Sequence, residues 1–230
     1  MRISANLIIC RNEGIYKTLR KFGFPKNKLT VIDTGVDFYK VYNHKILKKY
    51  NFDGVFLGRL HFLKGIFDLP KIWFYVTQEL PEARLAVIGS GNTKTLKSLN
   101  NKIKALGVSK NIKILGPLVD SQMLDILKTA KVFLFTDYEA GFSLATSEAM
   151  AAGIPVVAYD LPIFGSIYKK GFIKVPKGNK KLAAKAIIKL LNNKELREAL
   201  GRQGVEQARE LDRKNTEQDF LGIINNEVNS

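Results

Sequence analysis

Residues 137–160 read Asp-Tyr-Glu-Ala-Gly-Phe-Ser-Leu-Ala-Thr-Ser-Glu-Ala-Met-Ala-Ala-Gly-Ile-Pro-Val-Val-Ala-Tyr-Asp, and they follow an apolar run at 131–135. That run predicts a buried strand, and the Gly-containing turn after it ends the strand. A helical stretch begins near Ser143, and Gly153-Ile154-Pro155 leads from it into a second apolar run. The order is therefore strand, loop, helix, strand, the unit from which parallel sheets are built.

The start of this helix offers a binding site for phosphate. Ser143 can cap the helix, and the free N–H groups of the first turn, with the positive end of the helix dipole, favour an anion. Gly141 lets a phosphate approach the main chain closely. Glu148, a little over one turn further on, could accept two hydrogen bonds from the vicinal diol of a ribose. These residues alone leave open a simple corner of a parallel sheet in which Glu148 is solvated.

The stretch resembles the signature of the retaining, nucleotide-sugar-dependent glycosyltransferases of GT-B fold, the group that includes glycogen synthase. That signature has two glutamates separated by seven residues around a Gly-Phe-Gly-type loop, followed by Glu-Ala-Met-Ala-x-Gly-x-Pro-Val-Val. Residues 148–157 match the second part. In the first part Glu139 and Glu148 are separated by eight residues, so Ala140 stands at the expected glutamate and Ser143 replaces the second Gly.

The resemblance implies roles for the residues of this loop and helix. It implies that Glu148 binds the donor ribose, and it leaves open whether Glu139 takes the place of the first glutamate near the donor sugar. The other donor-binding residues that it implies here are Gly141, Phe142, Ser143 and Leu144.

Composition indicates a globular protein of a reducing compartment. The 230 residues are 46% apolar, which is enough to bury a sizeable core. The one cysteine, Cys10, excludes an internal disulfide framework and a cysteine-based metal cluster. The chain start lacks a basic segment with a long apolar core, and no apolar run reaches the ~20 residues that span a bilayer. We expect a soluble cytoplasmic protein.

The net charge of +16 is concentrated before Glu195. From that residue onward eight acids face five basic residues, so residues 1–194 carry +19. This excess favours an anionic partner such as a nucleotide, a phospholipid surface or nucleic acid. A lysine-rich composition is the alternative explanation. Peripheral contact with the anionic cytoplasmic face of the membrane stays open, whereas nucleic acid is disfavoured because no basic motif is interleaved with aromatics.

Residues 1–50 resemble the end of another domain. The pattern predicts a strand at 6–10, a helix at 13–22, a strand at 30–32 and a turn rich in Gly and Asp at 33–37. In the GT-B family a similar order closes the N-terminal, acceptor-binding domain before the interdomain linker. The linker would be the polar, Lys-rich segment 38–50.

From Phe52 onward strands and helices alternate, which predicts an α/β fold with a doubly wound parallel sheet. This Rossmann-like domain, the C-terminal half of a GT-B fold, would span 51–194, with a C-terminal helical extension at 195–230. The expected strands are 54–57, 85–88, 112–115, 131–135, 155–158 and 172–175, and the expected helices are 66–79, 94–106, 121–129 and one from 143.

Ligands of such sheets bind beyond the carboxyl ends of the strands, where the loops after 54–57 and 131–135 both lie. Arg59 and Lys64 could place two cations on a diphosphate. In the family, Gly-Arg-Leu…Lys-Gly at this strand end holds the donor diphosphate, and Gly58, Arg59 and Lys64 match it. Gly89-Ser90-Gly91 lacks the rest of a dinucleotide fingerprint or P-loop, which disfavours NAD and ATP hydrolysis.

The resemblance implies sugar transfer from a nucleotide-diphosphate sugar with retention of configuration. Arg59, Lys64 and Glu139 would be the catalytic residues, and the resemblance implies no metal, no cofactor and no covalent protein nucleophile. Only ~45 residues resemble the acceptor domain, short of the ~100 to 150 of a domain. We therefore expect the donor-binding half of an enzyme that needs an N-terminal domain or partner subunit. The alternatives are a non-catalytic nucleotide-sugar-binding subunit of a split transferase and a basic nucleic-acid-binding module.

Overall fold

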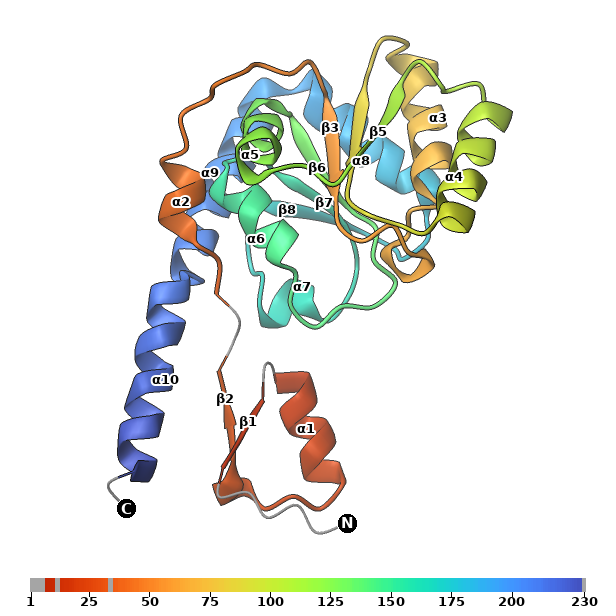
Figure 1. Ribbon diagram of the computed structural model, residues 1–230. Helices are drawn as coiled ribbons and strands as arrows, with labels where there is room; N and C mark the ends of the chain where they lie inside the picture. Colours follow the sequence, from red (N-terminus) through yellow and green to blue (C-terminus); the bar gives the residue numbers. More distant parts are fainter. Residues whose placement is uncertain (1–6, 11–12, 33–34, 229–230) are drawn as a thin grey trace.

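The computed structural model describes residues 7–10, 13–32 and 35–228. Its main feature is a six-stranded parallel sheet in the order β5-β4-β3-β6-β7-β8 (Figure 1). The order reverses between β3 and β6, so the predicted doubly wound, Rossmann-like sheet is confirmed, and a ligand crevice is expected at this switch point. The strands are β3 (Gly54–Leu57), β4 (Leu85–Ile88), β5 (Ile112–Gly116), β6 (Val132–Phe135), β7 (Val156–Tyr159) and β8 (Phe172–Val175).

Helices cover both faces of this sheet because side chains alternate along each buried strand. In β6, Leu134 belongs to the apolar cluster of one face, and Phe133 belongs to that of the other. The first face packs against α3 (Leu69–Glu79), α4 (Thr93–Ala105) and α8 (Lys180–Asn192). The second packs against α2 (Phe38–Tyr42), α5 (Asp120–Thr129), α6 (Leu144–Ala151), α7 (Ile163–Ser166) and part of α9 (Lys194–Glu210).

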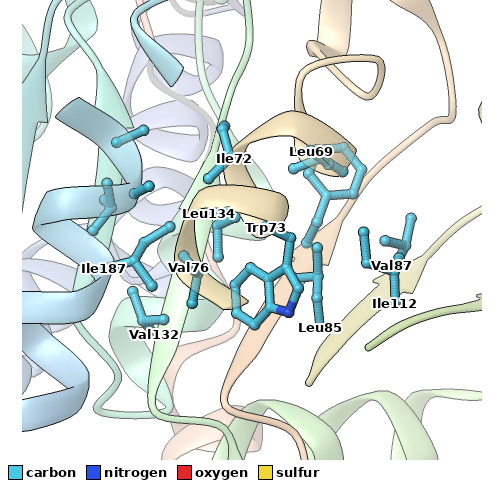
Figure 2. Packing of buried hydrophobic residues seen from close by; sticks show 14 of the residues in the cluster. Leu69, Ile72, Trp73, Val76, Leu85, Val87, Ile112, Val132, Leu134 and Ile187 are labelled. Carbon is cyan, nitrogen blue, oxygen red and sulfur yellow. The ribbon is translucent and has the colours of Figure 1, made fainter. Parts of the chain in front are cut away.

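Trp73 of α3 lies at the centre of the first face (Figure 2). Its ring packs among Leu85, Val132 and Leu134, and its Nε1–H donates to the Ala83 carbonyl at 3.0 Å. A side chain at Gly54 would approach the Trp73 ring to 2.6 Å. Glycine at the start of β3 therefore makes room for the largest core side chain.

The N-terminal residues form a separate small unit. Strand β1 (Ile8–Cys10) pairs in parallel with β2 (Leu29–Val31), and α1 (Glu13–Lys21) lies beside them (Figure 1). The expected strands and helix are therefore present in this part. Asn6 of the predicted strand and residues 33–34 of the predicted turn lie outside the described residues.

The segment 38–50, expected as a polar linker, contains an unpredicted helix. Asp37 caps α2 by accepting a hydrogen bond from the Lys40 N–H, and Phe38 and Val41 are buried on the second face of the sheet. Asp125 of α5 then accepts hydrogen bonds from the N–H groups of Leu47 and Lys48, both at 3.0 Å. The segment is thus packed along the domain.

One helix boundary and one short helix also differ from expectation. Helix α3 starts at Leu69 rather than at residue 66, because a 3-10 turn, Phe62–Lys64, is followed by Gly65 in the left-handed conformation at φ +64°. The short helix α7 was not predicted, because its four residues carry no helical period.

Helix α9 packs against α6 through glycines. A side chain at Gly201 would lie 2.3 Å from the Gly153 carbonyl oxygen, and Gly204 lies against Met150. After α9 the chain passes Val36, whose N–H donates to the Leu211 carbonyl at 2.9 Å and whose carbonyl accepts from the Arg213 N–H at 2.7 Å. Helix α10 (Arg213–Val228) then extends away from the sheet on the side of the N-terminal unit (Figure 1).

Candidate functional site

The loop after β3 carries the two predicted cations. Gly58 continues the strand pairing by donating to the Ile88 carbonyl at 3.0 Å, and Arg59 next to it is exposed. No carboxylate of the described residues pairs with Arg59. Its guanidinium is therefore available for an anion.

Lys64 is held at the switch point by the loop after β6. Its ammonium pairs with the buried carboxylate of Asp137, and its carbonyl accepts from the Thr136 hydroxyl at 2.9 Å. The Tyr138 N–H donates to the Leu63 carbonyl at 2.8 Å. Three successive residues of the loop after β6 thus contact the loop after β3. These contacts position Lys64 before any ligand binds.

The positive charge of Lys64 offsets part of the free-energy cost of burying the Asp137 carboxylate. Burial raises the pKa of the Asp137 carboxyl, while the hydrogen bond and charge of Lys64 lower it. A buried carboxylate is tolerated when it is paired and hydrogen-bonded in this way. The pair leaves Arg59 as the unmatched cation of the loop.

The start of α6 is built as predicted. The Ser143 hydroxyl caps the helix by accepting from the Thr146 N–H at 3.3 Å, and Tyr168 Oη donates to the Ser143 carbonyl at 2.7 Å. Within the described residues, nothing accepts a hydrogen bond from the main-chain N–H groups of Leu144 and Ala145. The first turn of α6 therefore keeps donors for an anion.

The loop before α6 contains the remaining predicted residues. Glu139 and Gly141 are exposed, and Glu139 has no hydrogen-bond or ion-pair partner in the described part of the chain. The Phe142 ring packs against Tyr168, with ring centroids 6.1 Å apart. The structure thus brings Lys64 and Asp137 into contact, and Glu139 forms no hydrogen bond or ion pair with either of them.

Glu148 lines a cavity of about 330 Å³ on the second face of the sheet. Burial raises the pKa of the Glu148 carboxyl to about 7; the negative charge of Asp120 adds to this rise, and Lys40 opposes it. The cavity is lined by Gly35, Asp37, Lys40, Val41, Asp120, Met123, Leu124, Leu144, Glu148 and Arg213.

Comparison with known proteins places this geometry in a family. The family model described as Glycosyl transferases group 1 matches residues 40–207, from α2 to α9. The chain belongs to the glycosyl transferases group 1 family. The resemblance to GT-B glycosyltransferases that the signature indicated is thereby confirmed, since the solved structures that this chain resembles include GT-B glycosyltransferases.

Two relatives and one solved structure illustrate the similarity. The chain is 30% identical over 167 residues to the phosphatidyl-myo-inositol mannosyltransferase of Mycobacterium leprae, covering 68% of this chain and 43% of that protein. It is 29% identical over 197 residues to the capsular polysaccharide biosynthesis glycosyltransferase CapM of Staphylococcus aureus, covering 78% and 50%. The chain thus spans half or less of these relatives. The structure of Anabaena Alr3699/HepE in complex with UDP-glucose superposes with a TM-score of 0.83 at 19% identity, covering 96% and 64%.

Sequence reasoning about this family member missed four polar groups around the crevice. Asp137 was quoted without a role, and Lys40 and Asp120 were not singled out. Asp68, at the start of α3, accepts hydrogen bonds from the hydroxyls of Tyr138 and Tyr159, both at 2.7 Å. Its other oxygen lies 3.0 Å from Lys180 Nζ. The only signal that could have found them is their position at strand ends and helix starts.

The described residues contain no group of three His, Cys, Asp or Glu side chains placed to hold a metal ion. Among them, too, no helix has the length and apolar composition to cross a membrane.

Proposed function

We propose that this chain binds a nucleoside-diphosphate sugar and supplies the donor-binding half of a retaining glycosyltransferase. Membership of the family supports the reaction class. The structural observation that best supports the proposal is the arrangement of groups at the start of α6. Its open first turn follows β6 at the switch point, and Glu148, one turn on, lines a cavity of about 330 Å³.

The diphosphate would lie between the loop after β3 and the first turn of α6. Arg59 offers a planar pair of donors, Lys64 a point charge, and the helix start its main-chain N–H groups. Negative charge grows on the diphosphate as the bond to the sugar breaks. Fixed cations and dipoles stabilise that charge without having to reorganise, so these groups would act as the electrophilic catalyst.

The nucleoside would follow the axis of α6 into the cavity. Glu148 would accept hydrogen bonds from both ribose hydroxyls, which requires the ionised carboxylate. Because its pKa is raised to about 7 in the empty site, binding would release a proton over part of the neutral range. Glu139, on the exposed loop before α6, would face the sugar.

The relatives support a sugar-nucleotide donor but cover more than this chain. The HepE structure contains UDP-glucose, and the Mycobacterium leprae relative is named as a mannosyltransferase. Transfer also needs an acceptor hydroxyl held within about 3–3.5 Å of the anomeric carbon, in a crevice that excludes water. We propose that further chain or a partner subunit provides that wall, and that transfer needs no metal ion.

The proposal is tested by calorimetry with a panel of nucleoside diphosphates and their sugars. We expect one base series to bind, and we expect Glu148→Ala to weaken it by on the order of 1.5–3 kcal/mol, the range for hydrogen bonds to a charged group. Failure of every nucleotide to bind would refute the proposal. Acceptor-dependent release of nucleoside diphosphate by this chain alone would refute the donor-half role, and the anomeric configuration of a product tests retention.

A further inference from the structure

We propose that the cavity beside Glu148 recognises a guanine base through Lys40 and Asp120. The inference rests on the proposed function, since it takes the ribose to lie at Glu148. It names the donor as a guanosine diphosphate sugar, which neither the family nor the fold determines.

The path of the nucleoside leads to these two residues. Leu144 and Glu148 are one turn apart on α6, and both line the cavity. With the diphosphate at the helix start and the ribose at Glu148, the base must occupy the part of the cavity between α2 and α5. Lys40 of α2 and Asp120 at the start of α5 line that part, and their charges act on Glu148.

The size and lining of the cavity suit a flat ring. About 330 Å³ lies within the range of small-molecule sites, which pair apolar walls with a few placed polar groups. The apolar walls can contact the faces of a base, and the charged pair can contact its edge. The apolar members are Val41, Met123, Leu124 and Leu144.

The polar pair presents a defined pattern of donors and acceptors. The Lys40 ammonium is bonded to the Asp120 carboxylate, and this contact raises the pKa of Lys40, which keeps the ammonium charged at neutral pH. An ammonium has three donors, and a carboxylate only accepts. One of the three donors is bonded to Asp120, so the pair offers two further donors beside two acceptor oxygens.

Guanine complements that pattern. Its Watson–Crick edge presents O6, N1–H and N2–H in order, so Lys40 can donate to O6 while Asp120 accepts from both N–H groups. Uracil places a carbonyl oxygen where N2–H should be, and adenine and cytosine place a ring nitrogen acceptor at the centre. Each of these sets an acceptor against the carboxylate, which costs affinity by repulsion and loss of a hydrogen bond.

The first test measures binding of GDP, IDP, UDP and ADP to the wild-type chain by calorimetry. These ligands share the ribose and diphosphate, so only the base differs. A bidentate base contact discriminates by ~1–3 kcal/mol, and we therefore expect GDP to bind about tenfold or more tighter than UDP and ADP. IDP lacks the N2 amine and should fall between them.

Two substitutions separate the contacts. Asp120→Asn should weaken GDP about tenfold and strengthen xanthosine diphosphate, because an amide can donate to the xanthine O2. Lys40→Gln should weaken GDP and IDP equally, since both carry O6. Glu82→Gln is the matched control: Glu82 is an exposed acid 3.4 Å from Lys110, before β4 and thus at the opposite end of the sheet, and its loss should change nothing.

The outcomes distinguish this inference from the proposed function. Binding of UDP as tight as that of GDP would overturn the guanine assignment and leave the proposed function standing. Unchanged GDP affinity in Asp120→Asn, with the fold intact by circular dichroism, would overturn it too. If no nucleoside diphosphate binds at all, the proposed function and this inference both fall.

Discussion

Lys64 pairs with Asp137 across the switch point between β3 and β6. The two residues are 73 positions apart in the sequence, yet each belongs to a loop that leaves the carboxyl end of its strand. The pair fixes a flexible lysine side chain before binding, so less conformational entropy remains to be lost when a diphosphate arrives. It also offsets the Lys64 charge, which makes Arg59 the stronger attraction for an anion at a distance.

Removal of either cation should therefore weaken diphosphate binding selectively. We expect Arg59→Ala and Lys64→Ala each to weaken a nucleoside diphosphate by on the order of 1.5–3 kcal/mol and the matching nucleoside much less, because only the diphosphate carries anionic oxygens. Calorimetry with both ligands measures this. Lys110→Ala, at an exposed lysine paired with Glu82, is the control. Equal losses for diphosphate and nucleoside would contradict the assignment.

Donor affinity should rise with pH up to about 7. The ribose hydroxyls donate to the ionised Glu148, whereas below its pKa of about 7 the empty site holds the protonated acid. Affinity should then fall by up to about tenfold per pH unit below 7 and level off above it. A nucleotide sugar is the ligand to use, because its diphosphate carries no proton that titrates near neutrality. Glu148→Gln should flatten the profile; a slope that persists in this variant would assign the proton elsewhere.

The same carboxyl should make the empty protein less stable as pH rises. Its folded pKa of about 7 exceeds the usual 4.5, so the folded state binds the proton more tightly than the unfolded state. The free energy of unfolding should therefore decline between pH 4.5 and 7 relative to Glu148→Gln. Urea unfolding of both proteins at several pH values measures the difference, and parallel curves would show that the carboxyl is not buried in this way.

Two glycines in the same conformation should differ in their tolerance of alanine. Gly65 and Gly107 have φ of +64° and +69°, but an added Cβ at Gly65 would lie 1.9 Å from the Thr136 carbonyl oxygen and one at Gly107 would meet nothing. We expect Gly107→Ala to cost about 1 kcal/mol and Gly65→Ala about 1–3 kcal/mol more. Gly65→Ala should also impair nucleotide binding by displacing Lys64. Equal costs in urea unfolding would argue against the close approach of the two loops.

Tyr168 should stabilise the start of α6. Its buried hydroxyl donates to the Ser143 carbonyl and lies 2.9 Å from the Ser147 hydroxyl. Tyr168→Phe should cost about 1–3 kcal/mol in thermal or urea unfolding, because it removes a buried hydrogen bond from each of these groups. Tyr75→Phe, at a half-buried ring whose hydroxyl makes no hydrogen bond within the described residues, should stay within about 0.5 kcal/mol. Similar costs for both would show that the hydroxyl does not hold the helix start.

The sequence was sufficient to predict the features that depend on residues close together in the chain. Strand positions followed from apolar runs, and the capping role of Ser143 followed from its place before a helix, since both patterns are local. The helix 38–42 was missed because Phe38 and Val41, its two buried side chains, are interspersed with Tyr and Lys and give no clear apolar pattern. The pairs Lys64–Asp137 and Lys40–Asp120 join segments that are far apart in the chain and that the strand order brings together, which no local pattern contains.

The hydrogen bonds of Val36 with Leu211 and Arg213 bring the entrance and exit of the large domain to one point. Gly35 is part of this contact, since a side chain there would lie 2.3 Å from the Arg213 Cα. A unit whose ends meet can be inserted into a host protein or circularly permuted with a short connection. The two ends of the domain formed by residues 36–212 therefore lie side by side. A related domain with another donor preference could replace it in a chimeric protein, with only two neighbouring junctions to join.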